Sequence, residues 1–256
     1  MEHVFKGHIC PIYVILKLVM KMKIIISPSK TQSPNYEKKF EDKELLFPKK
    51  HKKVLAMLRK HTKASLRNGM KIKDDLLHNT YKNIKNYNKL EEFQAFYGFT
   101  GLVFFNMDRN SYSVEDLKYI EENVRILDAF YGVLEPGTLI KPYRLDMKMQ
   151  LGINLYKHWD ISEYFKDELI INLASDEFSK MIDKDIITVS FFQDKAGKHV
   201  NQPTYAKMAR GRFVDFMVKN KITSVEEVKT FNLDGYCLNE DLSSVSNLIF
   251  TRKKQQ

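Results

Sequence analysis

The sequence has few cysteines and no pattern of metal-ligating side chains. Only Cys10 and Cys237 occur among 256 residues, which excludes a disulfide framework and indicates a reducing compartment. The cysteines form no CxxC pair, and the seven histidines give no HxxxH or HxxE spacing. The sequence therefore predicts no metal site and no cofactor. No stretch is rich in glycine, serine or proline, so no linker divides the chain.

Long apolar runs are also missing. The run Ile9–Met20 is interrupted by Lys17 and is too short to span a bilayer, and it lacks a well-formed signal-peptide cleavage pattern. We expect residues 1–21 to be an N-terminal extension, disordered or added by an upstream start codon. We expect residues 22–256 to form one domain that does not bind or cross a membrane. The sequence does not reveal the oligomeric state, and a monomer is our expectation.

Positive charge is concentrated in one region. Between Lys38 and Lys89 there are 16 Lys+Arg and 5 Asp+Glu, a surplus of 11, whereas the whole chain carries +10. The remaining residues therefore sum to −1. Such a footprint favours a polyanion partner, with DNA, duplex or distorted, as the first candidate and RNA or a nucleotide as others. The alternative is a solvated basic helix face.

Two helices joined by a short turn lie inside this basic region. The first is predicted over 47–66, the second over 76–90, and the turn contains Gly69. A helix-hairpin-helix has this order, and its glycine allows the backbone to approach a phosphate, with Lys71 and Lys73 beside it. A second hairpin glycine is missing after Met70, and many helical hairpins bind nothing.

The strongest local pattern runs from Arg125 to Met147. A capping pattern at Ser113 starts a predicted helix whose apolar positions recur as far as Phe130, Gly132 ends it, and residues 139–145 are extended. Arg125, Arg144 and Tyr143 in this unit suit a phosphate or another planar anion. The alternative is that Arg125 pairs with a carboxylate and Arg144 tethers a loop.

Three further segments place polar side chains where strands end or on one helix face. The predicted strand 23–27 runs into Ser27, Lys30 and Thr31, and the strand 169–173 runs into Asn172 and Ser175. Simple alternatives are a turn closed by serine hydroxyls and a helix cap. On the predicted helix 204–219, Lys207 and Arg210 share a face, either at an anion site or on a solvated flank.

The segment 93–108 is rich in phenylalanine and tyrosine. Its aromatic side chains are Phe93, Phe96, Tyr97, Phe99, Phe104 and Phe105. Core packing is the commoner fate of such residues, although bases can also stack on aromatics beside a basic groove.

A series of segments, in order, resembles the signature of the YaaA peroxide-stress resistance protein family. They are Lys23–Thr31, Arg125–Leu127, Tyr131–Leu134 with Pro142–Met147, Ile171–Ser175, Tyr205–Gly211, Phe231–Tyr236 and Ser243–Ser244. The resemblance implies a cytoplasmic protein that helps cells withstand hydrogen peroxide and oxidative stress, with a helix-hairpin-helix and a basic cleft suited to DNA. It also implies an association with lower free intracellular iron, and places Asn172, Ser175, Lys207 and Arg210 in the site.

The alternation of strands and helices predicts one compact mixed α/β domain, with a mixed sheet, surrounding helices and the basic hairpin as an excursion. Our first hypothesis is a DNA-binding stress protein with little sequence specificity. In it, Gly69, Lys71 and Lys73 contact nucleic acid, while the other candidate residues line a cleft. The alternative is an enzyme that acts on a nucleotide or a nucleic-acid base. No triad, carboxylate pair or cofactor motif supports it, so catalysis is the less favoured interpretation.

Overall fold

One mixed sheet organises the part of the chain that the structure describes. The computed structural model describes residues 21–34, 36–195 and 197–253, so the run Ile9–Met20 lies outside it. Within these residues eight strands form the sheet, in the order β4-β3-β1-β6-β7-β10-β9, with β8 paired to β7. The strands are β1 (Lys21–Ile26), β3 (Val124–Asp128), β4 (Gly132–Leu134), β6 (Glu168–Asn172), β7 (Ile187–Lys195), β8 (Lys198–Val200), β9 (Cys237–Leu238) and β10 (Asn247–Lys253).

The central strands β3, β1, β6, β7 and β10 run parallel. The outer pairs β3–β4, β7–β8 and β10–β9 are antiparallel, which confirms the predicted mixed α/β class. A second, antiparallel pair joins β2 (Phe93–Gln94) to β5 (Leu139–Ile140). Because the five central strands are parallel, the loops at their carboxyl ends meet along one edge of the sheet, where α/β folds commonly bind ligands.

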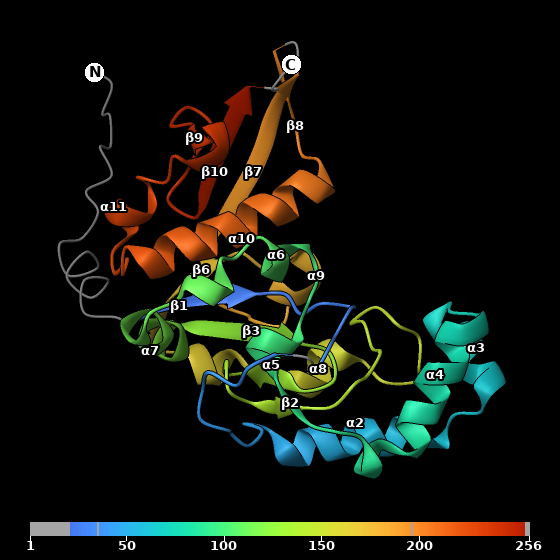
Figure 1. Cartoon of the computed structure of the whole chain (residues 1–256). Coiled ribbons are helices and arrows are strands. Elements are labelled where there is room, and N and C mark those ends of the chain that lie inside the picture. Colours follow the sequence, from blue (N-terminus) through green and yellow to red (C-terminus); the bar gives the residue numbers. More distant parts are fainter. Residues whose placement is uncertain (1–20, 35, 196, 254–256) are drawn as a thin grey trace, which may run out of the picture.

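Helices surround this sheet. In Figure 1 the strands β1, β3 and β6 lie between α10 and α2, and α7 packs on β1 and β3. The helices are α2 (Pro48–Lys60), α3 (Lys63–Met70), α4 (Asp74–Lys85), α5 (Ala95–Gly98), α6 (Leu102–Phe105), α7 (Val114–Asn123), α8 (Leu155–Trp159), α9 (Asp176–Ser179), α10 (Pro203–Lys219) and α11 (Val225–Val228). Short 3₁₀ turns cover Tyr87–Lys89, Arg109–Ser111, Ser162–Phe165 and Leu233–Gly235.

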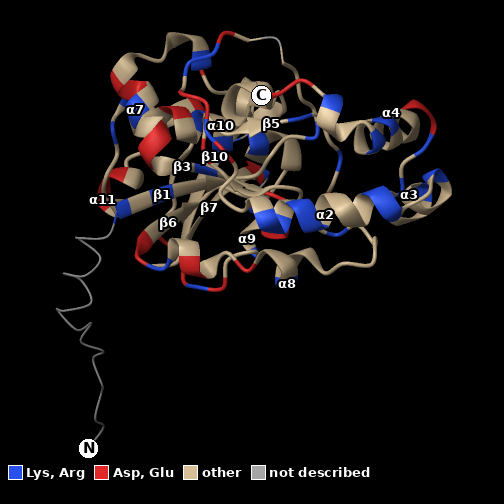
Figure 2. Cartoon of the chain, turned by 90° about the horizontal axis from the view of Figure 1, so that it is seen from below, with Lys and Arg blue, Asp and Glu red and all other residues tan. Residues whose placement is uncertain are grey.

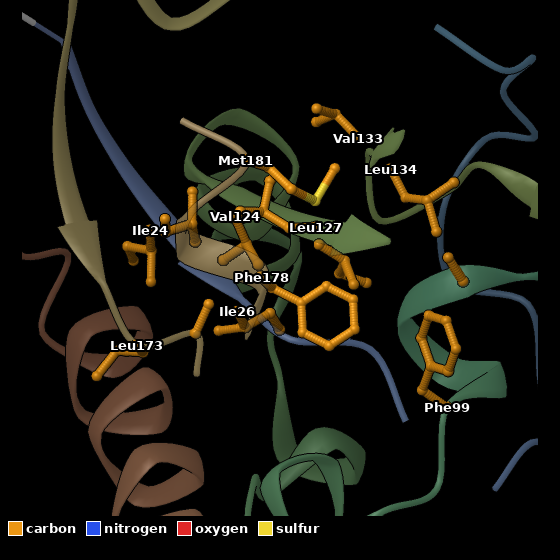
Figure 3. Close-up of a cluster of buried hydrophobic side chains, with 14 of the residues drawn as sticks. Ile24, Ile26, Phe99, Val124, Leu127, Val133, Leu134, Leu173, Phe178 and Met181 are labelled. Carbon is orange, nitrogen blue, oxygen red and sulfur yellow. The ribbon is translucent and has the colours of Figure 1, made fainter. Parts of the chain in front are cut away.

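The core is continuous across these layers. Figure 3 shows a part of it, where Ile24 of β1 lies near Val124 of β3 and Ile26 lies near Leu127 and the ring of Phe178. Each of the two isoleucines and Leu127 is fully buried. Burying one such side chain contributes roughly 1.5–3 kcal/mol, so this cluster fixes how the strands and the following loops sit.

The predicted helix from Ser113 to Phe130 is wrong in its second half. Ser113 forms the expected capping box with Asp116, and α7 begins at Val114. The helix ends at Asn123, however, and residues 124–128 are the fully buried strand β3. Their apolar positions also fit helical spacing, but pairing with β1 and burial on both faces decide for a strand.

The basic region forms three helices instead of the two that the sequence predicts. We call α2, α3 and α4 the basic arm; its lysines and arginines are marked in Figure 2. Gly69 does not lie in the turn, because it is inside α3. The turn before α4 is formed by Lys71, which has a left-handed φ of 54°, the buried Ile72 and Lys73. The basic arm therefore does not contain a helix-hairpin-helix with a glycine at the turn.

Helix α8 ends at Trp159, and the next residue, Asp160, has a left-handed φ of 38°. The strand β10 is not at the sheet edge, since the short β9 pairs with it. The strands β7 and β8 form a hairpin, and the predicted helix 204–219 is confirmed as α10.

Candidate functional site

A cleft of about 380 Å³ lies at the carboxyl ends of β1 and β6. Its walls come from the loops that follow these two strands, from α6, from the segment 143–146 and from α10. Eight of the residues predicted for the site line this cleft: Ser27, Lys30, Thr31, Tyr143, Arg144, Ser175, Lys207 and Arg210. The topology thus brings together motifs that are up to 183 residues apart (210 − 27).

Ser27 and Ser175 join the two strand-end loops. The Ser27 hydroxyl donates to the Ser175 hydroxyl over 3.3 Å and accepts from the backbone N–H of Ser175 over 2.9 Å. Ser175 is the N-cap residue of α9, but its side chain makes no capping hydrogen bond. Helix capping therefore does not account for the role of Ser175, which instead lines the cleft.

Asn172 supports the cleft from behind. Its side chain is 2% exposed, donates to the Thr188 hydroxyl over 3.2 Å and accepts from the N–H of Ala174 over 2.9 Å. It does not line the cleft, so the structure corrects its predicted place in the ligand-binding wall. Because both amide groups are used inside the protein, Asn172 positions the loop that carries Ser175.

Two residues outside the set predicted from the sequence fix the cleft walls. Ser29 exchanges a hydrogen bond with the Thr31 hydroxyl over 3.0 Å. Gln32 accepts from the N–H of Tyr143 over 3.2 Å and donates to its carbonyl over 3.4 Å. These bonds hold the segment 143–146 against the loop after β1. Ser29 lies in the Lys23–Thr31 motif and Gln32 follows it, which is the only sequence signal for them.

Four cations and two carboxylates line the cleft. Lys30 and Arg144 both pair with Asp146, at 3.1 Å and 3.6 Å. Lys207 and Arg210 come from α10, and Glu177 comes from α9. The formal charge of the lining is therefore 4 − 2 = +2. Asp146 belongs to the Pro142–Met147 motif but is not among the residues predicted for the site.

Three of these charged groups carry buried atoms without a hydrogen-bond partner. Among the described residues, Arg144 Nε, Arg210 Nε and Glu177 Oε1 are inaccessible and unpaired. Burial also lowers the pKa of Arg210, an effect that the charge of Asp176 partly offsets, but a guanidinium stays protonated at neutral pH. Buried polar groups usually have partners, so this cluster marks the cleft as a place where side chains can re-pair with a ligand.

Tyr143 connects the cleft to a buried carboxylate. Its hydroxyl donates to Asp128 Oδ2, while Asp128 Oδ1 accepts from the N–H groups of Phe130 and Tyr131 over 2.7 Å and 2.9 Å. Burial raises the pKa of Asp128 to about 6, although the three hydrogen bonds to its carboxylate act in the opposite direction and lower the pKa. Burial and the nearby Asp128 charge raise the pKa of Tyr143 well above its ordinary value. No separate sequence signal marks Asp128, because it lies in the misassigned strand β3.

Arg125 lies outside this cleft, which corrects its predicted role. It is 6% exposed, pairs with Glu135 at 3.3 Å and donates to the Tyr164 hydroxyl over 2.8 Å. It also donates to the carbonyls of Glu121 and Val124. The alternative interpretation, pairing with a carboxylate, is therefore the correct one. Arg125 lines a separate cavity of about 1710 Å³.

The basic arm contacts Gln150 and Leu151, which follow the segment 143–146 of the cleft wall. The Gln150 N–H donates to the Gly69 carbonyl over 3.0 Å, and His61 Nε2 lies 3.2 Å from the Leu151 carbonyl. A Cβ on Gly69 would lie 2.4 Å from the Gln150 carbonyl oxygen, so this glycine serves protein packing. Lys71 and Lys73 are exposed.

The described part of the chain contains no group of three or more His, Cys, Asp or Glu side chains that could hold a metal ion. Within the same residues, no helix is both long enough and apolar enough to cross a membrane.

Comparison with known proteins decides the family. The protein-family model described as "Peroxide stress protein YaaA" matches residues 22–242 of this chain. The chain belongs to the YaaA peroxide stress family. It is similar to a UPF0246 protein of Fusobacterium nucleatum, with 40% identity over 246 residues that cover 91% of this chain and 99% of the relative. A UPF0246 protein of Clostridium botulinum (strain Eklund 17B) is 36% identical over 256 residues, covering 90% and 99%.

The YaaA family match begins at the second residue of β1 and includes the other strands and helices that form the cleft, as far as α10. A third relative, a UPF0246 protein of Agathobacter rectalis, is 34% identical over 249 residues, with 91% of this chain and 99% of the relative covered.

Proposed function

We propose that this YaaA family member binds nucleic acid during peroxide stress and holds a phosphate group in the cleft at the carboxyl ends of β1 and β6. The observation that carries the proposal is the convergence of Lys30, Arg144, Lys207 and Arg210 on one cleft. Guanidinium groups match phosphate oxygens in a two-pronged geometry, and ammonium groups add charge.

The hydroxyl groups of the cleft suit the same ligand. Ser27, Thr31 and Ser175 line it beside the cations, and hydroxyl side chains commonly contact phosphate and sugar oxygens. A phosphate would also compete with Asp146 for Lys30 and Arg144. Ligand binding would then give the two cations a new partner without leaving them unpaired.

The cleft size favours one nucleotide unit over a whole duplex. Its volume of about 380 Å³ lies near the lower end of the range of roughly 300–1,000 Å³ for small-molecule sites. Residues 38–89, which include the basic arm, add a surplus of 11 positive charges, which attracts the rest of a polyanion over a distance.

In this proposal the arm contributes general attraction, including DNA contacts of Lys71 and Lys73, and the cleft holds the phosphate. Asp74 and Asp75 occupy the first turn of α4, and their carboxylates oppose a phosphate at that helix end. Sequence specificity would be low, because phosphate contacts carry no base information. Any effect on free iron would be indirect.

The test is fluorescence anisotropy of labelled single-stranded and duplex DNA over a salt series. The variant Lys30→Glu/Lys207→Glu alters two exposed cations of the cleft. The control Lys166→Glu/Lys229→Glu makes the same charge change on lysines that are outside the cleft and pair with Glu163 and Glu226.

We expect the cleft variant to bind at least tenfold more weakly. Its log–log salt slope should fall by roughly two, because each lysine that no longer neutralises a phosphate lowers the slope by roughly one. The control should stay within about threefold of the wild type. Equal weakening of both variants would reduce the effect to net charge and contradict a phosphate site in the cleft.

One observation favours a second function, an enzyme that acts on a nucleotide or base. Tyr143 lines the cleft and donates to Asp128, whose pKa of about 6 lies in the range used for general acid–base catalysis. Incubation with nucleoside mono- and triphosphates, followed by chromatography, tests it. A product formed by the wild type and absent with Tyr143→Phe would support this function, and unchanged substrates would reject it.

A further inference from the structure

Phe105 is a large aromatic side chain that the fold leaves in water. It is 77% exposed, whereas Phe104 beside it is 1% exposed. Within the described residues Phe105 takes part in none of the ring contacts that join Phe96, Tyr97, Phe99 and Phe104. The core-packing interpretation therefore holds for Phe104 and is wrong for Phe105.

Phe105 lies beside the cleft. It ends α6, and the first residue of that helix, Leu102, lines the cleft and is 40% exposed. Residues three apart in a helix share a face, so Phe105 extends the same side of α6 outward from Leu102. Phe104, which precedes Phe105, also lines the cleft but is buried against Phe96 and Phe99.

Two glycines hold α6 rigidly between the elements that carry the cations. A Cβ on Gly101 would lie 2.4 Å from the Ser29 hydroxyl oxygen, and one on Gly211 would lie 2.2 Å from the Val103 carbonyl oxygen. Gly211 follows Arg210 on α10. These close approaches fix α6, and with it the backbone position of Phe105, relative to the helix that carries Lys207 and Arg210.

We propose that Phe105 stacks on an unpaired base of the nucleic-acid strand whose phosphate lies in the cleft. This inference rests on the proposed function and adds the ligand class: single-stranded or locally unpaired nucleic acid. In a duplex both faces of a base are already stacked, so its face is not available to the phenyl ring. A stacking aromatic beside cations that track the backbone is a common arrangement for single strands.

The charge of the neighbouring residues distinguishes Phe105 from Val114, another exposed apolar side chain. Val114 is equally exposed, at 77%, but it is the first residue of α7, followed by Glu115 and Asp116. A nucleic acid would be repelled there. Val114 therefore provides a control of matched exposure.

The experiment compares three labelled probes of equal length: a single-stranded oligonucleotide, the corresponding duplex and an abasic strand that keeps the sugar–phosphate backbone. Phe105→Ala should weaken binding of the single strand about tenfold and leave binding of the abasic strand within twofold. Val114→Ala should change neither, and Phe105→Tyr should restore single-strand binding. Equal affinity of Phe105→Ala and wild type for the single strand would overturn the stacking role.

A spectroscopic readout complements the affinities. Phe105→Trp places an exposed indole beside the cleft, while the native Trp159 is fully buried. The single strand should quench the new fluorescence and the abasic strand should not. If Lys30→Glu/Lys207→Glu abolishes binding while neither Phe105 variant responds, the stacking role fails and the proposed function stands. If the wild type binds none of the probes, both fail.

Discussion

Ser27 and Ser175 are 148 residues apart in the chain, yet their hydroxyl oxygens lie 3.3 Å apart where β1 and β6 end. The parallel pairing of these two strands brings the serines together, and the same edge of the sheet carries the cleft. The site is thus a consequence of strand order, and each wall can be tested through the residue that positions it.

Ser27→Ala should destabilise the fold by about 1–3 kcal/mol. The substitution removes the acceptor of the Ser175 N–H and leaves a partly buried donor without a partner. Urea denaturation measures the decrease. Ser111→Ala is the control, because its hydroxyl only donates to an exposed carbonyl, and it should stay within about 0.5 kcal/mol of the wild type. Identical denaturation midpoints of Ser27→Ala and the control would show that the junction of the loops contributes nothing to stability.

Gly211→Ala should displace α6 from α10. The new Cβ would collide with the Val103 carbonyl oxygen, and overpacking of this kind costs about 1–3 kcal/mol. Thermal unfolding tests the stability, and anisotropy tests whether single-strand binding falls with it. Arg212→Ala, on the same helix and 45% exposed, is the control for the helix itself. The close packing of α6 would be disproved by a Gly211→Ala protein that matches this control in both measurements.

Arg125→Lys should lower stability without changing nucleic-acid affinity. The guanidinium contacts two carbonyls, a tyrosine hydroxyl and Glu135, and a lysine cannot reproduce this planar set of bonds. We expect a destabilisation of about 1–3 kcal/mol in urea denaturation and a dissociation constant within twofold of the wild type. A tenfold weaker affinity in the folded variant would return Arg125 to the binding site.

Asp128 should make the protein less stable as pH rises from about 4 to about 6. Its folded pKa of about 6 is above the ordinary value of 3.8, so the folded state binds more protons than the unfolded state in this window. The stabilising effect of the protonated carboxyl is complete below the unfolded pKa and is lost above the folded one, by about 3 kcal/mol.

Asp128→Asn removes this titration. Urea midpoints measured from pH 4 to pH 7.5 should fall less with rising pH in the variant than in the wild type. Asp75→Asn, exposed on α4, should keep the wild-type profile. Parallel profiles of Asp128→Asn and wild type would show that this carboxyl does not titrate in the window.

Local signals in the sequence predict the helices and strands that are marked by a capping residue or by a clear apolar pattern. The capping box at Ser113 and the helix 204–219, which corresponds to α10, are predicted correctly from the sequence. Residues 124–128 are misassigned from the sequence, because a short buried apolar run fits helix and strand equally and only pairing with β1 decides.

The motifs of the site can be recognised in the sequence, but their arrangement in space cannot be predicted from it. Ser27, Arg144 and Lys207 line one cleft because of strand order, which no local pattern encodes. Arg125 has the same chemistry as Arg144, and only its partner Glu135 and its burial show that it is structural. The exposure of Phe105 likewise depends on how α6 packs on α10.

The most direct test compares the cleft with the basic arm at equal charge change. Lys30→Glu/Lys207→Glu and Lys71→Glu/Lys73→Glu each replace two lysines that the structure places at the surface, so long-range attraction changes equally in both. Single-strand affinity is measured by anisotropy over a salt series. A cleft phosphate site predicts that affinity falls at least tenfold further in the cleft variant than in the arm variant. A greater fall in the arm variant, with a wild-type affinity in the cleft variant, would contradict a phosphate site in the cleft.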